Sequence, residues 1–403
     1  MMDLNKAFNS WLATSGEYQA GKTFEYVMEK YGLQRSEIIR LAGNESTIGT
    51  SPKAIKAAQE AAASSNYYDE PQSESLIQAL ENKFASSGLD MSKLGVVVGN
   101  GMDSIIEHLL GIFCDSSSSI VNYSPTFIYY DFAAKRRGIE IIDVPRTKPV
   151  TAILEAVKEN TKLVFLCTPN NPDGSVVAVD EIEKLARELE KKNIILFIDH
   201  AYIDFANHRY NVQNLFEKLP DARLATKEMA ELAELPMMTS LEEYNAAGGG
   251  LRIDSQYPNL VIGYTFSKAY AMAGFRVGYG LMSKELQARY LKLNTPFLCA
   301  KASLAAAKVA LEDEAHFNKI IKNHNKQKPY LMAELIKLGY KPYESHANFI
   351  LFEAKVKANE VLEKLMSQGI IIRAIPNVSD FALRVTIGTA VENQKFIEAL
   401  ANV

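Results

Sequence analysis

Cysteine and histidine are scarce in this sequence of 403 residues. The three cysteines, Cys114, Cys167 and Cys299, are odd in number and far apart, so they form neither a disulfide framework nor a zinc site. The six histidines show no metal-ligand spacing, and we expect no bound metal. These absences fit a reducing cytoplasm, and they favour chemistry carried by side chains or an organic cofactor over metal chemistry.

Long apolar runs and a dominant sign of charge are missing as well. No run of about 18 apolar residues occurs, so we expect no membrane span. The residues from Met1 to Ala20 mix charged and polar side chains and do not form a secretory signal. The net charge of −4 implies no broad basic face, so we expect no nucleic-acid partner.

The middle of the sequence contains a regular alternation of short β-rich runs and longer helical patterns. Short buried strands separated by helices predict an α/β fold with a mainly parallel sheet and helices on both faces. In such sheets a ligand lies at the carboxyl ends of the strands. The expected strands are Val96–Val98, Ile120–Tyr123, Ile139–Val144, Leu163–Cys167, Ile194–Asp199 and Leu260–Tyr264. The expected helices begin near Asp103 and Thr126 or run through Ala152–Lys158 and Glu181–Lys191.

The chain is longer than one ordinary core usually holds together, so two domains are expected. We assign residues 53–297 to a large domain and residues 298–403 to a smaller α+β domain. Residues 1–52 are too few for a core of their own and are expected to pack on the small domain. A segment at about 207–255 interrupts the alternation and is interpreted as an insertion, which is a lid over the site, a surface decoration or a dimer contact.

The most informative segment surrounds Lys268. Hydroxyl side chains precede the lysine at Thr265 and Ser267, and Arg276 follows it by eight residues. A phosphorylated aldehyde requires this set, because the amine condenses with the aldehyde while the hydroxyls and the guanidinium hold the phosphate. A surface lysine in a turn is the alternative, and the complete segment argues against it.

Asp199 ends an apolar run, and Tyr202 follows three residues later. A carboxylate in this place can pair with a protonated pyridine nitrogen, which keeps the ring able to absorb the electrons of a substrate carbanion. Tyr202 can hydrogen-bond a ring hydroxyl, and Asn171, in a tight turn after an expected strand, can offer its amide to the same hydroxyl. The alternatives are a helix cap for Asp199 and a plain turn around Asn171.

The segment Gly99–Ser104 joins an expected strand to an expected helix. The free backbone N–H groups at Gly101 and Met102 would form an anion site. The segment lacks the third glycine of a dinucleotide-binding loop, which disfavours a nicotinamide enzyme.

Two further residues have a functional and a structural interpretation. Phe127 could stack on a pyridine ring or could be an ordinary core aromatic. Arg384 lies in an apolar strand pattern, and a buried arginine needs an anionic partner. That partner is either a substrate carboxylate or an internal salt bridge.

Taken together, these residues resemble the aspartate-aminotransferase fold family, fold type I of the pyridoxal-phosphate enzymes. The resemblance rests on the order of Asn171, Asp199, Tyr202, Lys268, Arg276 and Arg384. It is closest to the histidinol-phosphate aminotransferase branch and covers nearly the whole chain. Segments similar to that branch are Tyr18–Lys22, Leu41–Glu45, Asn66–Asp69, Ala347–Phe349 and Gly369–Arg373.

The resemblance implies a large domain built on a seven-stranded, mainly parallel sheet, a smaller α+β domain, and pyridoxal 5'-phosphate as the cofactor. It also implies a homodimer, because the residue matching Tyr67 reaches the cofactor phosphate of the neighbouring subunit. Lys268 would hold the cofactor and move a substrate proton, and Asp199 and Tyr202 would assist it. The residues expected to contact substrate are Tyr18, Asn44, Arg373 and Arg384.

The implied reaction is the transfer of an amino group from a histidinol-phosphate-like or aromatic amino donor to a 2-oxo acid. Asp199 and Lys268 are 69 residues apart, whereas the branch has about thirty, and His200 replaces its usual glutamate. Other reactions on the same scaffold therefore stay open: a decarboxylase of the threonine-phosphate type, or an elimination or cyclisation enzyme. A non-enzymatic regulator would need a DNA-binding domain, which the short N-terminal segment does not supply.

Overall fold

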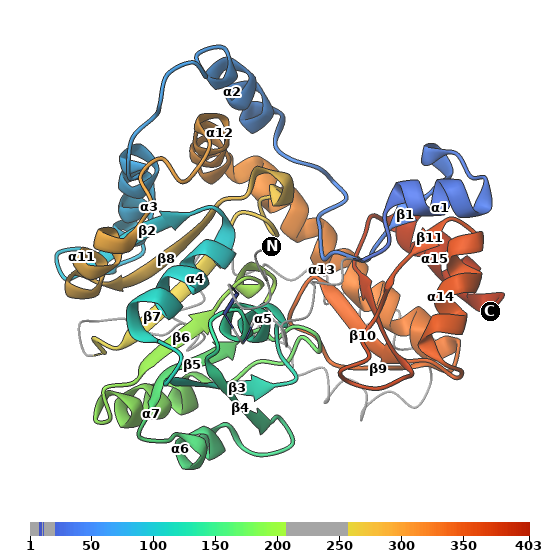
Figure 1. Cartoon of the computed structure of the whole chain (residues 1–403). Helices are drawn as coiled ribbons and strands as arrows, with labels where there is room; N and C mark the ends of the chain where they lie inside the picture. Colours follow the sequence, from blue (N-terminus) through green and yellow to red (C-terminus); the bar gives the residue numbers. More distant parts are fainter. Residues whose placement is uncertain (1–7, 10, 12–20, 207–256) are drawn as a thin grey trace, which may run out of the picture.

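The computed structural model describes residues 8–9, 11, 21–206 and 257–403. Tyr18 and the predicted insertion at about 207–255 lie outside the described residues. The described chain forms a large unit around a seven-stranded sheet and a small unit around a four-stranded sheet, with α13 (Glu314–Lys337) running between them (Figure 1).

The seven strands follow the order β2-β8-β7-β6-β5-β3-β4. All neighbours are parallel except β8, which is antiparallel to both β2 and β7, so the predicted mainly parallel sheet is confirmed. The strands are β2 (Leu94–Gly99), β3 (Ser119–Ser124), β4 (Glu140–Pro145), β5 (Thr161–Cys167), β6 (Ile195–Asp199), β7 (Leu260–Thr265) and β8 (Gly278–Ser283). The sequence analysis missed β8, because Gly278 and Gly280 weaken its strand signal.

Helices cover both faces of this sheet. One face carries α4 (Gly101–Phe113), α5 (Tyr129–Lys135) and α11 (Lys284–Leu293). The other face carries α3 (Glu74–Ser86), α6 (Ile153–Ala156), α7 (Val179–Glu190) and α12 (Lys301–Glu312), and α2 (Pro52–Ala62) packs on α12. The strands other than the edge strand β4 are buried on both sides, which is why most of them are nearly continuous apolar runs.

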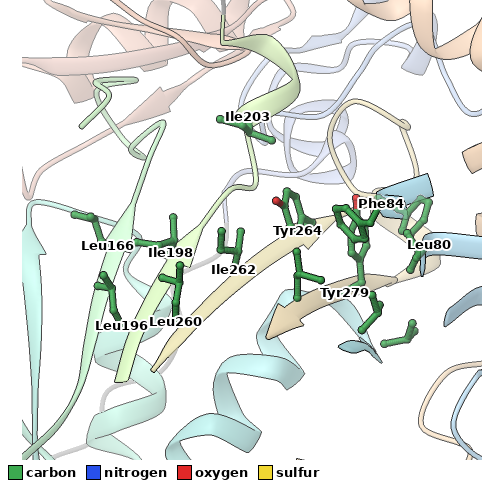
Figure 2. Packing of buried hydrophobic residues seen from close by; sticks show 14 of the residues in the cluster. Leu80, Phe84, Leu166, Leu196, Ile198, Ile203, Leu260, Ile262, Tyr264 and Tyr279 are labelled. Atoms are coloured by element: carbon green, nitrogen blue, oxygen red, sulfur yellow. The ribbon is translucent and has the colours of Figure 1, made fainter. Parts of the chain in front are cut away.

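Figure 2 shows the second face from close by. Leu196 and Ile198 of β6 point the same way as Leu260 and Ile262 of β7, because alternate residues of a strand share a face. They belong to one buried cluster with Phe84 of α3. The residues between them, such as Phe197, point to the opposite face and pack with α4 and α5.

The small unit contains the antiparallel sheet β12-β13-β10-β9 and a two-stranded parallel ribbon of β1 with β11. Its strands are β1 (Ile39–Arg40), β9 (Lys341–Pro342), β10 (Phe349–Glu353), β11 (Ile370–Ile371), β12 (Arg373–Ala374) and β13 (Ala382–Thr386), and its helices are α1 (Phe24–Tyr31), α14 (Ala358–Ser367) and α15 (Ala390–Ala401).

Short 3-10 helices lie along the chain at Arg35–Glu37 (η3), Val150–Ala152 (η4), Ile203–Phe205 (η5) and Ala273–Phe275 (η6).

The N-terminal segment and α12 show where the two units divide. Val27 and Ile38 pack with Met366 and Ile371, so the part of the N-terminal segment from α1 to Ile38 lies on the small unit, whereas Trp11 lies beside Gly138 of the large unit. By contrast, the buried side chains of α12 join the core of the large unit, against α2 and α3. We therefore propose that the small unit begins near Asp313, later than the boundary at 298 expected from sequence.

The described residues contain no helix that is both long and apolar enough to cross a membrane. They also contain no group of histidine, cysteine and acidic side chains arranged to hold a metal ion.

Candidate active site

A cavity of about 770 Å³ opens at the carboxyl ends of the central strands. The last residues of three neighbouring strands line it: Cys167 of β5, Asp199 of β6 and Thr265 of β7. This is the place expected for a ligand in a parallel sheet. The residues predicted from sequence that line it are Asn44, Met102, Phe127, Asn171, Asp199, Tyr202, Thr265, Ser267, Lys268, Arg276, Arg373 and Arg384.

Lys268 follows β7 and points its amine into the cavity, where Nζ donates a hydrogen bond to the carbonyl oxygen of Gly43 at 3.2 Å. Burial, together with the positive charges of Arg384 and Arg276, lowers the pKa of Lys268 to about 8. A lysine must be neutral to attack an aldehyde. The site therefore provides a nucleophilic amine much closer to neutral pH than a free lysine would.

This lowered pKa predicts how capture of an aldehyde cofactor depends on pH. The neutral fraction of Lys268 rises as the pH passes about 8, so the rate of pyridoxal-phosphate capture by the apo-protein should rise with a midpoint near that pH. Stopped-flow visible absorbance measures this rate. Arg384→Met removes one of the charges that depress the pKa and should move the midpoint upward. A midpoint near 10 in the unmodified protein would contradict the assigned environment.

Asp199 is 2% exposed at the end of β6. Its Oδ2 accepts a hydrogen bond from Tyr130 Oη at 2.5 Å, and its Oδ1 accepts one from the backbone N–H of Ala201 at 2.9 Å. Burial raises the pKa of Asp199 to about 6, against the opposing effect of these hydrogen bonds. A buried carboxylate of this kind is stabilised by a cationic partner, such as a protonated ring nitrogen. The sequence analysis missed Tyr130, because nothing local marks it as a neighbour of Asp199.

The start of α4 and the loop after β7 form an anion cup. Arg276 Nη2 donates to Asp103 Oδ2 at 2.8 Å, close to the first turn of α4. Gly101 has a φ of +75°, and a Cβ on it would lie 2.4 Å from Arg276 Nη2. Glycine is therefore required for the guanidinium to approach the helix N-terminus, where free N–H groups favour a phosphate. The amine, the buried carboxylate and this cup together fit pyridoxal phosphate.

Tyr202 and Arg384 meet through the side chain of Asn171. The hydroxyl oxygen of Tyr202 accepts hydrogen bonds from Asn44 Nδ2 at 3.0 Å and from Asn171 Nδ2 at 3.4 Å. Arg384 donates to Asn171 Oδ1 and, at 3.2 Å, to the carbonyl oxygen of Ala42. Both of these acceptors are neutral, and Arg384 also lines the cavity.

The family model for aminotransferase class I and II matches residues 36–400 of this chain. The chain belongs to this family. It is an enzyme that uses pyridoxal phosphate to move an amino group from an amino donor to a 2-oxo acid, and the resemblance inferred from sequence is confirmed.

Individual relatives of this aminotransferase support the same conclusion. A histidinol-phosphate aminotransferase from Methanococcoides burtonii is 32% identical over 401 residues, which cover 97% of each chain. Among solved structures, the histidinol-phosphate aminotransferase of Sinorhizobium meliloti, in complex with pyridoxal-5'-phosphate, has a TM-score of 0.77 at 21% identity and covers 98% of this chain and 96% of its own. The L-threonine-O-3-phosphate decarboxylase of Porphyromonas gingivalis has a TM-score of 0.69 at 22% identity, covering 91% and 99%. At these identities the two structures show the fold alone.

Three residues predicted from sequence are not among the described residues that line the cavity of this aminotransferase: Gly101, Tyr67 and Tyr18. Gly101 lies beside it, next to Arg276. Tyr67 is 71% exposed on the protein surface, and Tyr18 lies outside the described residues. The structure adds one pair that the sequence analysis did not foresee. Arg40 and Glu45 both line the cavity and form an ion pair at 3.1 Å. Glu45 belongs to a recognised segment, but only the fold shows that Arg40 faces it.

Proposed function

We propose that this aminotransferase takes a phosphorylated, histidinol-phosphate-like or an aromatic amino donor and exchanges its amino group with a 2-oxo acid such as 2-oxoglutarate. The observation that carries the proposal is the cluster of basic side chains on the wall away from the anion cup. Lys22, Arg40, Arg373 and Arg384 line this part of the cavity, and Glu45 opposes them. A phosphate dianion pairs well with several such groups, because arginine offers bidentate charge-assisted bonds.

The curated relatives support a donor of this type, since the similarity to a histidinol-phosphate aminotransferase extends over 97% of both chains. Phe127 and Ile128 add apolar surface to the cavity wall. An aromatic ring of the donor or the pyridine ring of the cofactor can pack on this surface.

Each residue of the proposed site has a distinct task. Pyridoxal phosphate, when bound, supplies an electron sink for a substrate carbanion. The Lys268 amine would hold the cofactor. Once displaced by the donor, it would take a proton from the substrate α-carbon and deliver it to the cofactor carbon that carried the aldehyde. Asp199 keeps the ring nitrogen protonated. Arg384 binds an anionic group of the substrate, which is the α-carboxylate where the donor has one.

Addition of single amino donors to the purified enzyme tests the choice of substrate. Histidinol phosphate should convert the lysine-bound cofactor to its amine form, and 2-oxoglutarate should reverse the change, both followed by visible absorbance. Histidinol without the phosphate should show kcat/KM lower by about ten-fold or more, because a lost charge-assisted bond costs about 1.5–3 kcal/mol.

The same experiment separates transamination from decarboxylation. Release of carbon dioxide from threonine phosphate, with no lasting amine form of the cofactor, would contradict the proposal and favour the decarboxylase alternative. Equal conversion of histidinol and histidinol phosphate would contradict the proposed phosphate contact.

We also propose that the active unit is a homodimer in which Tyr67 completes the site of the neighbouring subunit. Tyr67 and Tyr68 are 71% and 83% exposed, and Tyr68 packs on Phe297 with 4.6 Å between the ring centroids. Exposed aromatic side chains grouped in this way are typical of a protein–protein interface.

Hybrid dimers test this arrangement. Tyr67→Ala and Lys268→Ala should each be impaired alone, and a mixture of the two variants, after subunit exchange, should regain activity in sites that combine one intact Tyr67 with one intact Lys268. Sedimentation of an active enzyme as a monomer would exclude a shared site.

A further inference from the structure

Asn44 connects the N-terminal segment to both units of the enzyme. Its backbone N–H donates to Thr386 Oγ1 at 3.0 Å, and its carbonyl oxygen accepts from Asn348 Nδ2 at 3.1 Å. Both partners belong to the small unit. Its side-chain Nδ2 reaches in the other direction and donates to Tyr202 Oη at 3.0 Å. Asn44 is 2% exposed, so these bonds form without competition from water.

The backbone of Asn44 has a φ of +54°, in the left-handed region. Glycine adopts this conformation most readily, and asparagine is among the few other residues that tolerate it. The local geometry alone would thus accept a glycine here. The feature that a glycine cannot supply is the side-chain amide directed at Tyr202.

The hydroxyl oxygen of Tyr202 receives two amide donors, Asn44 Nδ2 and Asn171 Nδ2. The orientation of Asn171 is fixed, because Arg384 can only donate and therefore faces the amide oxygen of Asn171. A phenol oxygen has two lone pairs, and the two amides occupy them. The hydroxyl hydrogen of Tyr202 must then point in a third direction. Tyr202 lines the cavity, which provides that direction.

Burial raises the pKa of Tyr202, so the phenol keeps its proton and acts as a donor. We infer that Asn44 is a positioning residue, not a substrate contact: by occupying a lone pair of Tyr202 it directs the hydroxyl hydrogen at the ring oxygen of the cofactor. This inference rests on the proposed role of Tyr202 and replaces the substrate role predicted for Asn44 from sequence. It does not depend on which amino donor the enzyme uses.

The consequence is a change in the pKa of the Lys268–cofactor linkage, meaning the nitrogen that joins Lys268 to the cofactor. A hydrogen bond donated to the ring oxygen stabilises negative charge there, and this matters most when the linkage has lost its own proton. Donation by Tyr202 therefore lowers the pKa of the linkage. If Asn44 no longer directs the hydroxyl, that pKa should rise.

The variant Asn44→Gly tests this, because it removes the amide and tolerates the left-handed backbone. The pKa of the linkage, read from a pH titration of the visible absorbance without substrate, should rise by up to about one unit. The cofactor should stay bound, and kcat should fall more than KM changes. Asn44→Asp should raise the pKa as well, because the carboxylate accepts the hydroxyl hydrogen and turns it away from the cavity.

A double-mutant cycle shows whether Asn44 acts through Tyr202. Tyr202→Phe should raise the same pKa, and the double variant Asn44→Gly/Tyr202→Phe should match Tyr202→Phe alone. Ile350→Val, in the buried core of the small unit, is the control for lost stability and should leave the pKa unchanged.

An unchanged pKa in Asn44→Gly, or a change that adds fully to that of Tyr202→Phe, would overturn the inference. An unchanged pKa in Tyr202→Phe would overturn the role of Tyr202 and the inference with it. Failure of the proposed donor would affect neither titration, because no substrate is present.

Discussion

Replacement of Lys268 by alanine is expected to abolish turnover and to remove the visible absorbance of lysine-bound cofactor. In the proposed function, the side chain supplies both the covalent attachment and the group that moves the substrate proton. Loss of a general base alone typically costs about 10²–10⁴-fold in rate, and loss of attachment adds to this. Steady-state kinetics and mass spectrometry after borohydride reduction measure the two effects separately.

Lys22 provides the matched control for this experiment, since it is the other lysine that lines the cavity among the described residues. Lys22→Ala should keep the reducible adduct and the visible absorbance. If Lys268→Ala retained a borohydride-reducible adduct within the site, another amine would carry the cofactor and the assignment would be wrong.

Replacement of Asp199 by alanine should lower kcat by orders of magnitude while the cofactor still binds. Lys268 and the anion cup at Gly101 and Arg276 remain in this variant, so attachment and phosphate binding persist. The ring nitrogen loses its anionic partner and its proton, and the substrate carbanion loses stabilisation. Parallel measurement of kcat and of the cofactor dissociation constant tests this, and a near-normal kcat would reduce Asp199 to a structural cap.

The stability of the apo-protein gives an independent test of the environment of Asp199. Its pKa is raised from an ordinary value of 3.8 to about 6, so the folded state holds the proton more tightly than the unfolded state does. The folded state is therefore destabilised as the pH rises through this interval. The full free-energy cost of burying the ionised Asp199 is present above about pH 6. Asp199→Asn, which carries no charge, should flatten the fall in apo-protein melting temperature between pH 4 and pH 6. An equal fall in both proteins would contradict the raised pKa.

Binding of the cofactor should stabilise the unmodified enzyme more than Asp199→Asn, which is the reverse of the effect of the Asp199 charge in the apo-protein. The proposed function pairs the Asp199 carboxylate with a cationic ring in the holo form, so pyridoxal phosphate should raise the melting temperature of the unmodified enzyme more than that of Asp199→Asn. Comparing the apo and holo melting temperatures of the two proteins separates the pairing of Asp199 with the ring from the free-energy cost of burying its charge.

The sequence by itself determined the sheet, its helical layers and the cofactor segment. Apolar runs ending at Cys167 and Asp199 mark buried parallel strands, because a strand covered on both faces contains few polar residues. The spacing of Thr265, Ser267, Lys268 and Arg276 is local, and its chemistry could be inferred before any contact was known. Family membership was apparent from the sequence because several such local segments follow one another in the order typical of the family.

Only the tertiary structure decided how distant segments meet. Tyr130 and Asp199 are 69 residues apart, Asn44 and Tyr202 are 158 apart, and Asn171 and Arg384 are 213 apart, yet each pair is hydrogen-bonded. No local pattern encodes such contacts, because they depend on how helices and strands pack in space. The docking of α12 on α2 and the antiparallel insertion of β8 into the sheet have the same origin. The sequence specified which groups the site contains, and the packing of the two units determined which groups each of them contacts.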